Sequence, residues 1–439
     1  MRYLSTRGRQ ETDLLGTILQ GLATDGGLFV PDEMPHFEPT EIRGETLAEI
    51  ASDLLAPFFV GSPLAAVLAE ICRDALDFPV PLVTLRDEPD PLAVLELFHG
   101  PTAAFKDVGA RFLAAAMERA LPLARGDTRP LTILVATSGD TGGAVAAAFH
   151  RRRGMRVAVL YPRGQVSPRQ QHQLNCWDDN VRSYEVEGTF DDCQALLKGA
   201  LADPALSRRQ RLSAANSINI GRLLPQVAYH AAAGLWYWRE HATPISAIVP
   251  TGNLGNGLAC IWARAMGMPI RDVVFAVNAN RTVPEFLATG EWQPRGSVRT
   301  LASAMDVGAP GNMERLRHLF PEFAELRAAV EAYPVDDAAI RAQIVKDDAR
   351  FGRVWCPHTA TGFWVYDHLP ENRRAGRPWY VCATAHPAKF DTIVEGIVGR
   401  HVPVPPSLAA LLARPAQSRS LAPRIEALAD ALAQWDKEL

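Results

Sequence analysis

The sequence is poor in cysteine, carries no strong excess of either charge and contains no long apolar run. Its six cysteines include no Cys-x-x-Cys pair, a pattern that favours free buried thiols in a reducing compartment. The net charge of −4 provides no basic field that would attract nucleic acid or an acidic membrane surface. No apolar segment approaches the roughly 20 residues that a membrane-spanning helix needs.

Signals for export and for metal binding are also scarce. Residues 1–8 (MRYLSTRG) lack the apolar core of a signal peptide, so we expect a cytoplasmic protein. Cys356, His358, Cys382 and His386 do not have the spacing of a zinc site, and we expect no metal. The chain of 439 residues is 48% apolar and 21% charged, which is typical of a globular protein with two or three domains.

The hydrophobic pattern divides the chain into a small leading part and two larger parts. In residues 1–92, two segments place leucine and isoleucine on one helical face, and we expect an N-terminal cap domain. Residues 93–235 and 236–439 are expected to form two α/β domains. The second would contain an irregular insertion at about 280–350, including a charged helical stretch with alternating signs, and a C-terminal helical tail.

Short apolar strands alternate with helices beyond residue 92. Polar, glycine-containing loops connect several of these strands to helical segments. This pattern predicts parallel sheets covered by helices, because a parallel neighbour strand requires a crossover connection. The expected strands are 92–98, Leu131–Ala136, Met155–Pro162, Ile245–Pro250, 273–278 and Trp379–Ala383.

Lys106 stands where a loop, residues 99–105, passes into a helix rich in good helix formers. A lysine at a helix start is unusual, because the helix dipole favours anions there. Among apolar neighbours its ammonium form would be disfavoured, and the neutral amine would be available as a nucleophile. The alternative is an exposed lysine whose ammonium reaches water past Asp107.

Two polar glycine loops follow strands, and either could hold an anion on the free amides of the next helix. Residues 252–257 (GNLGNG) match neither a dinucleotide-binding fingerprint nor a P-loop. Residues 138–143 (SGDTGG) do not match a dinucleotide fingerprint either, because no ribose-binding acid follows about 20 residues later. We expect a β-branched side chain at Gly255 to obstruct close approach and to resist a positive φ. Tight turns alone would also explain the glycines. A nucleophilic lysine with a monophosphate cradle favours pyridoxal phosphate.

Several motifs together resemble the threonine synthases of the longer bacterial and fungal type. The resemblance runs from residue 3 to about residue 390, and one departure is Gly311, where the family pattern has serine. The matching segments are 3–8 (YLSTRG), 25–31 (DGGLFVP), 99–107 (HGPTAAFKD), 136–143 (ATSGDTGG), 216–219 (NSIN), 250–256 (PTGNLGN), 303–306 (SAMD) and 384–390 (TAHPAKF).

The resemblance implies the fold type II architecture of pyridoxal-phosphate enzymes, with the cofactor between two parallel-sheet α/β domains and a small N-terminal domain. Lys106 matches the Schiff-base lysine, and Thr384 matches the hydroxyl partner of the pyridine nitrogen. The segment matching the cofactor phosphate loop is Gly252, Asn253, Leu254, Gly255 and Asn256. The segment matching the loop for the substrate carboxylate is Ser138, Gly139, Asp140 and Thr141.

The implied reaction converts O-phospho-L-homoserine and water into L-threonine and phosphate, in a monomer or homodimer. Arg111, Arg222 and Lys389 lie in or beside matched motifs and are candidates for holding the substrate phosphate, although each could be an ordinary solvated cation. A phospho-lyase acting on the same substrate would share every motif, and a serine/threonine dehydratase would share most. A protein that keeps the fold without catalysis is a third alternative.

Overall fold

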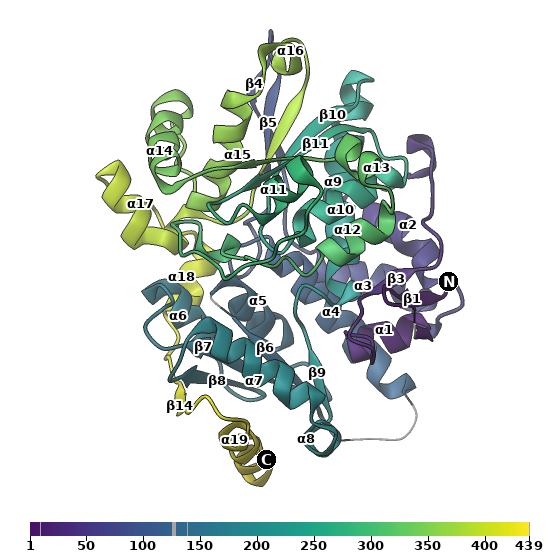
Figure 1. The fold of residues 1–439 in the computed structure, drawn as a ribbon, viewed down its shortest axis with the longest axis vertical. Coiled ribbons are helices and arrows are strands. Elements are labelled where there is room, and N and C mark those ends of the chain that lie inside the picture. The colour runs from purple at the N-terminus through teal and green to yellow at the C-terminus, as the bar shows by residue number, and fades with distance from the viewer. Residues whose placement is uncertain (9, 125–128, 138, 439) are drawn as a thin grey trace.

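The structure, a computed structural model, describes residues 1–8, 10–124, 129–137 and 139–438. It consists of two lobes and an N-terminal region (Figure 1). One lobe, the upper one in Figure 1, contains a six-stranded sheet, and the other contains a five-stranded sheet. Among the helices in the described part of the chain, none combines the length and apolar character that crossing a membrane requires.

The six-stranded sheet is parallel except at β4, which runs antiparallel to β5. Its central strands are apolar and buried on both faces, as helix-covered parallel strands are. In β10, Ala247 and Val249 face α9 and α10, whereas Ile248 faces α15, following the period of two. In sheet order the strands are β12 (Glu331–Pro334), β11 (Ile270–Val277), β10 (Ile245–Pro250), β13 (Trp379–Ala383), β5 (Leu92–Glu96) and β4 (Leu82–Arg86).

Helices cover both faces of this sheet. One layer contains α9 and α10, and the opposite layer contains α15 with α14 and α17 outside it. The bounds of these helices and the nearby smaller ones are α9 (Ile220–His241), α10 (Gly255–Ala265), α11 (Thr282–Thr289), α12 (Met313–Leu319), α13 (Phe323–Ala329), α14 (Asp337–Phe351), α15 (Pro357–His368), α16 (Glu371–Arg374) and α17 (Asp391–Val398).

The five-stranded sheet is entirely parallel. Helices α4 and α5 cover one face, and α7 with the C-terminal α19 covers the other. In sheet order the strands are β14 (Arg419–Leu421), β8 (Val181–Val186), β7 (Met155–Pro162), β6 (Leu131–Ala136) and β9 (Leu212–Ala214). The helices are α4 (Lys106–Ala120), α5 (Asp140–Phe149), α6 (Pro168–Asn175), α7 (Phe190–Ala202), α8 (Pro204–Gln210), α18 (Pro406–Leu412) and α19 (Ile425–Glu438).

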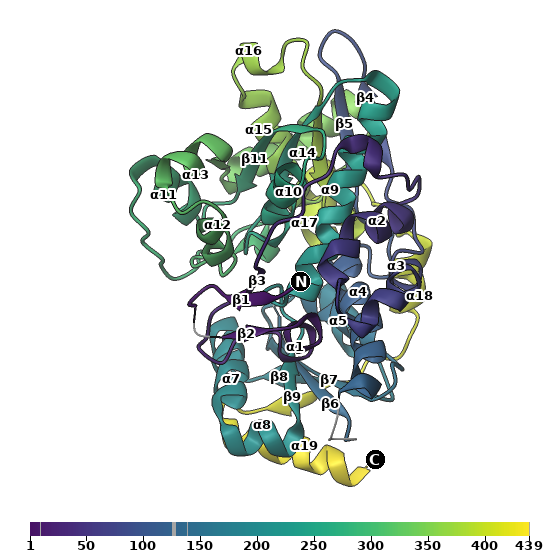
Figure 2. The same ribbon diagram turned by 90° about the vertical axis from the view of Figure 1, so that its right-hand side faces the viewer.

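The N-terminal region packs along one side of the two lobes, as Figure 2 shows. It combines a small antiparallel sheet with helices that contact α4 and α9. The start of α2 carries a capping box, in which Thr46 and Glu49 satisfy each other's backbone amides. The elements are β1 (Tyr3–Ser5), β2 (Glu11–Thr12), α1 (Leu14–Gln20), β3 (Phe29–Pro31), α2 (Leu47–Phe59) and α3 (Leu68–Ala75).

Sheet membership differs in two places from the contiguous domains expected from the sequence. Strand β5 lies near the start of the segment 93–235 but pairs with β13 in the six-stranded sheet. Strand β14 lies in the tail but pairs with β8 in the five-stranded sheet. The chain therefore crosses between the lobes more than once, because open strand edges rather than sequence proximity decide the pairing.

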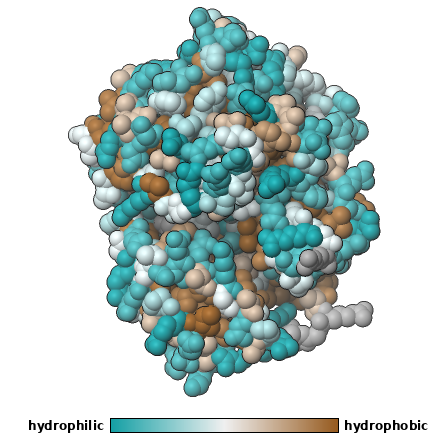
Figure 3. All heavy atoms as spheres, viewed as in Figure 1, coloured by the Kyte–Doolittle hydropathy of each residue, from teal (hydrophilic) through white to brown (hydrophobic). Residues whose placement is uncertain are grey.

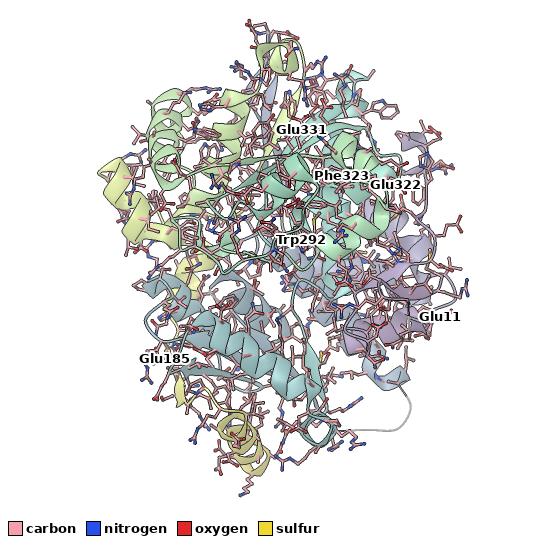
Figure 4. The ribbon with its side chains drawn as sticks, viewed as in Figure 1. Glu11, Glu185, Trp292, Glu322, Phe323 and Glu331 are labelled. Atoms are coloured by element: carbon pink, nitrogen blue, oxygen red, sulfur yellow. The ribbon has the colours of Figure 1, made fainter. Side chains whose placement is uncertain are left out.

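The insertion at 280–350 is more regular than expected. The charged stretch 324–348 is not one helix, because β12 interrupts it and pairs with β11 at the sheet edge. Trp292 and Phe323, labelled in Figure 4, pack edge-on against Phe286, with ring centroids 5.6 and 5.4 Å from it. These contacts pin the outer part of the insertion onto α11.

Cysteine burial and the molecular surface agree with the composition. All six cysteines are free and buried, as expected. On the face shown in Figure 3 the surface is mainly hydrophilic, with apolar residues in small scattered groups. Large exposed apolar side chains, such as Val60 and Val298, occur singly.

Arg315 of α12 joins three separate segments in the interior. Its guanidinium donates to the carbonyl of Phe29 on β3 at 3.0 Å, to the carbonyl of Ile218 at 2.7 Å and to the side chain of Asn312 at 2.8 Å. Asn312 in turn donates to the carbonyl of Asn253 at 3.0 Å, in the loop before α10. The N-terminal region is thereby connected to that loop. Burial lowers the pKa of Arg315 to about 9.

We expect Arg315→Met to lower the free energy of unfolding by about 3 kcal/mol, because it leaves three buried oxygens without their charged donor. Urea unfolding followed by tryptophan fluorescence measures this change. Arg317→Met on the same helix is the control, since Arg317 is exposed and its loss should cost about 0.5 kcal/mol or less. Equal changes in the two variants would contradict the role of Arg315 as a connection.

Candidate active site

Three loops leave the carboxyl ends of β10, β13 and β5, which are neighbours in the six-stranded sheet. The amide of Leu97 donates to the carbonyl of Ala383 at 3.0 Å, and the amide of Phe105 donates to the carbonyl of Thr384 at 2.8 Å. These bonds hold the start of α4, and with it Lys106, beside the loop after β13. The carboxyl ends of parallel strands are where α/β sheets bind ligands.

Lys106 is the first residue of α4, as the sequence predicts, and its side chain is half-buried. Removal from water lowers its pKa to about 8. Asp140 opposes this shift, whereas Arg222 and Lys389 add to it. The amine is therefore neutral in a much larger fraction of molecules at neutral pH than an exposed lysine would be, which makes it a usable nucleophile or base.

Asp140 and Lys389 form a buried ion pair between the two lobes. Asp140 begins α5 in the five-stranded lobe, and Lys389 follows β13 in the other lobe. The Lys389 Nζ lies 2.9 Å from Asp140 Oδ1 and donates to the carbonyl of Thr102 at 2.6 Å. Gln170 donates to the same carboxylate oxygen at 2.9 Å. Burial alone would raise the pKa of Asp140, but the neighbouring cations, foremost Lys389, hold it well below its usual range.

Arg222, near the start of α9, is a second buried cation. Its Nη1 donates to the carbonyl of Ala215 at 2.8 Å, whereas its Nε has no hydrogen-bond partner among the described residues. Burial lowers the pKa of Arg222 to about 10, and Asp107 partly opposes this shift. The fully buried Nε is a donor that an anionic guest could satisfy.

The charges around Lys106 are unbalanced. Lys389 and Arg222 are buried cations, Lys106 with its pKa of about 8 is still largely protonated at neutral pH, and Asp140 is the ionised carboxylate that faces Lys389 and Lys106. Asp107 is the carboxylate that acts on Arg222; burial raises its pKa, and two hydrogen bonds from Thr102 oppose that shift. A site with this excess of positive charge favours a ligand that brings negative charge.

The loop between β10 and α10 presents the free amides of a helix N-terminus. Leu254, not a glycine, adopts the left-handed conformation, with φ of 61°. A Cβ at Gly252 would lie 2.6 Å from the Met305 Cα, whereas a Cβ at Gly255 would meet its nearest atom at 3.7 Å. The expectation for Gly255 is thus wrong in its stated reason: Gly255 has no positive φ, and close backbone approach occurs at Gly252.

The asparagine side chains of this loop are already bonded within the protein. Asn256 accepts from the Tyr229 hydroxyl at 2.5 Å and donates to the carbonyl of Pro250 at 3.2 Å. Asn253 donates to the Ser217 hydroxyl at 2.7 Å. The loop can therefore offer an anion its backbone amides rather than these side chains.

Thr384 is the residue that directly follows β13. Its side chain is buried, and its hydroxyl has no hydrogen-bond partner among the described residues. Its backbone amide donates to the Thr359 hydroxyl at 3.1 Å, which fixes its position. Because buried hydroxyls in native proteins are almost always paired, this one indicates a partner supplied by a ligand.

Arg111 is not brought together with the other candidate cations. Its guanidinium donates to the carbonyls of Ala75 and Asp74 at 2.8 and 2.7 Å and to the Asp77 carboxylate at 2.7 Å, all at the end of α3. These acceptors occupy the guanidinium on the side of α4 that faces the N-terminal region. The expectation that Arg111 holds a substrate phosphate has no support from this geometry.

The loop between β6 and α5 is placed at the site by Asp140. Ser138, another candidate, lies outside the described residues. Gly139 has φ of 147°, and its amide donates to the Thr137 hydroxyl at 3.0 Å. Thr141, in the first turn of α5, is half-buried.

Two residues of the site are not among the cofactor or substrate candidates that the sequence provides. His358, at the start of α15, is buried, and its pKa responds to Asp140, Lys106 and Lys389. Gln170 reaches Asp140 from α6. Neither residue belongs to a motif that indicates cofactor or substrate binding. Only the fold therefore identifies these two residues as part of the site.

Comparisons with known proteins identify the family of the chain. A family model described as "Pyridoxal-phosphate dependent enzyme" matches residues 77–383, "Threonine synthase N terminus" matches 2–76, and "Threonine synthase, C-terminal" matches 359–432. The threonine synthase of Serratia marcescens is 37% identical over 419 residues, which cover 94% of each chain. That of Escherichia coli strain K12 is 36% identical, again with 94% of each chain covered.

Solved structures show the same likeness. The threonine synthase structure from Escherichia coli matches with a TM-score of 0.89 and 34% identity, covering 99% of this chain and 100% of that one. The yeast structure matches with a TM-score of 0.90 and 26% identity, covering 100% and 99%. The expected fold type II architecture, with two α/β lobes and a small N-terminal region, is confirmed. The chain belongs to the threonine synthase family of pyridoxal-phosphate-dependent enzymes.

Proposed function

We propose that this protein is a threonine synthase that uses pyridoxal phosphate to convert O-phospho-L-homoserine and water into L-threonine and phosphate. The observation that carries the proposal is that Lys106, Thr384 and the free amides of α10 lie on the loops that leave three neighbouring strands, with Lys106 held beside Thr384 by the bond from the Phe105 amide. The lysine with a lowered pKa matches the aldehyde of the cofactor, and the unpaired buried hydroxyl matches its pyridine nitrogen. The anion-binding helix N-terminus matches its phosphate.

The residues present fit the cofactor. The amine of Lys106 would bond to the aldehyde, the amides of Gly252, Asn253, Leu254, Gly255 and Asn256 would hold the phosphate, and the Thr384 hydroxyl would face the ring nitrogen. When bound, pyridoxal phosphate supplies an electron sink that stabilises negative charge at the substrate α-carbon. A hydroxyl can hydrogen-bond the ring nitrogen without the full negative charge of a carboxylate.

Lys106 is proposed as the base of the reaction. A neutral amine can take the proton from the substrate α-carbon and move a proton at the β-carbon, where water then adds. Its lowered pKa keeps a usable fraction of the amine unprotonated at neutral pH. Phe105 beside it and the buried pair of Asp140 and Lys389 limit the water that could protonate it.

The substrate brings a phosphate and a carboxylate, and the excess positive charge of the site suits both. Lys389 and Arg222 are proposed to attract these groups, with the unpaired Nε of Arg222 as a free donor. The amides of Asp140 and Thr141, in the first turn of α5, are proposed to receive the carboxylate, with Gly139 as the N-cap that precedes them. Ser138 remains a candidate for the same role.

The net charge of −4 and the free, buried cysteines support an enzyme that acts on a small molecule in the cytoplasm rather than on nucleic acid. The direct test of the function supplies purified enzyme with pyridoxal phosphate and O-phospho-L-homoserine. Threonine and phosphate should appear in equal amounts. A keto acid and ammonia in place of threonine would overturn the proposal in favour of a phospho-lyase.

Lys106→Ala should lower turnover by about 10³-fold or more, because it removes both the covalent attachment and the base. Borohydride reduction of the loaded parent protein, followed by peptide mapping, should place the pyridoxyl group on Lys106. Attachment of the cofactor to the apoprotein should become faster as the pH rises through about 8, where the amine loses its proton. Lys198→Ala, at an exposed position, is the control. A rate that rises only near pH 10.5, or label on another lysine, would refute the assignment.

Gly252→Ala should weaken pyridoxal phosphate binding by about tenfold or more, since its Cβ would press on the Met305 backbone and overpacking costs about 1–3 kcal/mol. Gly255→Ala is the matched variant in the same loop and should change the Kd by about threefold or less, because ordinary contacts surround that position. Spectroscopic titration of each apoprotein measures the Kd. A larger loss of pyridoxal phosphate affinity in Gly255→Ala than in Gly252→Ala would contradict the importance of the close approach at Gly252.

Thr384→Val should stabilise the apoprotein by about 1 kcal/mol, because it removes an unpaired buried hydroxyl. The same change should reduce turnover by about tenfold, whereas Thr384→Ser should stay largely active. Thr359→Val is the control, since its hydroxyl is already bonded and its loss should destabilise the apoprotein. Thermal unfolding and threonine formation are measured together. Lower apoprotein stability with unchanged turnover in Thr384→Val would show that the hydroxyl serves the fold instead.

A further inference from the structure

His358 is a buried histidine at the site. Of its two ring nitrogens, one has a hydrogen-bond partner among the described residues and the other has none. His358 lies in the first turn of α15, is 3% exposed and packs against the Phe390 ring, with centroids 4.9 Å apart. Its Nε2 accepts a hydrogen bond from the Ala304 amide at 3.0 Å. Its Nδ1 is buried and has no hydrogen-bond partner within the described part of the chain.

The contact with Ala304 determines which ring nitrogen carries the proton. A backbone amide can only donate, so Nε2 must present its lone pair, and the proton of the neutral ring then resides on Nδ1. The unpartnered atom is therefore an N–H donor. Burying such a donor without an acceptor is costly, and native proteins rarely do so unless a ligand completes the pair.

The surroundings keep this ring uncharged. Burial lowers the pKa of His358 to about 4, Asp140 of α5 opposes the shift, and Lys106 of α4 and Lys389 after β13 add to it. The three charged groups that influence the ring belong to three different elements. A neutral donor contributes a hydrogen bond to an anion without adding another positive charge beside Lys106 and Lys389.

We propose that the Nδ1–H of His358 donates a hydrogen bond to an anionic oxygen of the bound substrate and so positions the substrate in the site. The proposal rests on the proposed function, because the oxygen belongs either to the phosphate or to the carboxylate of O-phospho-L-homoserine. A role as a proton-transferring base does not fit, since Nε2 is occupied by Ala304 and Nδ1 already carries the proton.

Two substitutions separate this role from a structural one. The amide nitrogen of asparagine falls near the place of Nδ1, so His358→Asn keeps a donor there and loses the contact with Ala304. The amide of glutamine reaches the place of Nε2, so His358→Gln keeps an acceptor for Ala304 and loses the Nδ1 donor. Substrate positioning requires His358→Asn to bind better than His358→Gln, whereas a purely structural histidine requires the reverse order.

The holoenzymes are titrated with inorganic phosphate and, separately, with L-homoserine, which lacks the phosphate. We expect His358→Gln to raise the Kd of one of these probes by about ten- to a hundredfold, the loss expected for one hydrogen bond to a charged group. A change for phosphate assigns the phosphate oxygen, and a change for L-homoserine assigns the carboxylate. The Kd of pyridoxal phosphate should stay within about threefold of the parent value.

A second measurement needs no substituted enzyme to be active. In the parent holoenzyme labelled with ¹⁵N-histidine, the Nδ1–H resonance that is missing from His358→Gln should shift downfield when the effective probe is added. Unchanged probe affinities in His358→Gln, or an unshifted resonance, would overturn the proposal. These readouts are independent of turnover, so a parent enzyme that forms no threonine would refute the proposed function and leave the binding result interpretable.

Discussion

Asp140 and Lys389 come from different lobes, and their buried ion pair is the contact that brings the two halves of the site together. A buried pair of this kind is stable only when the remaining polar atoms are satisfied, and here Thr102 and Gln170 supply those bonds. The carboxylate that influences Lys106, Asp140, is thus already paired with Lys389. Removal from water lowers the pKa of Lys106, and the two members of the ion pair act on it in opposite directions, because Asp140 opposes the shift and Lys389 adds to it.

The excess of buried positive charge makes the site incomplete without a guest. Arg222 is buried with an unpaired Nε, and the Thr384 hydroxyl and the His358 Nδ1 are likewise unpaired within the described residues. Each of these groups costs stability in the free protein, and each regains it when a ligand supplies the missing partner. An anionic cofactor and an anionic substrate should thus stabilise this fold by linkage, more strongly than their contact area alone would suggest.

The parts of the fold that could be predicted from sequence are those where one local signal dominates. Strands β6, β7, β10 and β13 have the expected bounds because each is a continuous buried run. Strand β12 is half-buried at an edge among charged residues and gives no such run. Arg111 is a candidate from the sequence because it lies beside a matched motif, but five residues along a helix turn a side chain by about 140°, away from Lys106. The sequence names Lys389 as a candidate cation, whereas its pairing with Asp140 and the position of His358 follow from the fold alone.

Arg315 explains why a small N-terminal region contributes to a site formed by the two lobes. Its three acceptors come from β3, from the segment before α9 and from the segment before α12. A planar guanidinium with five donors can reach all three at once, whereas a lysine ammonium could not match their directions. Through Asn312 and Asn253 the same cation fixes the loop before α10. The position of the anion-binding amides therefore depends on how the N-terminal region packs against the two lobes.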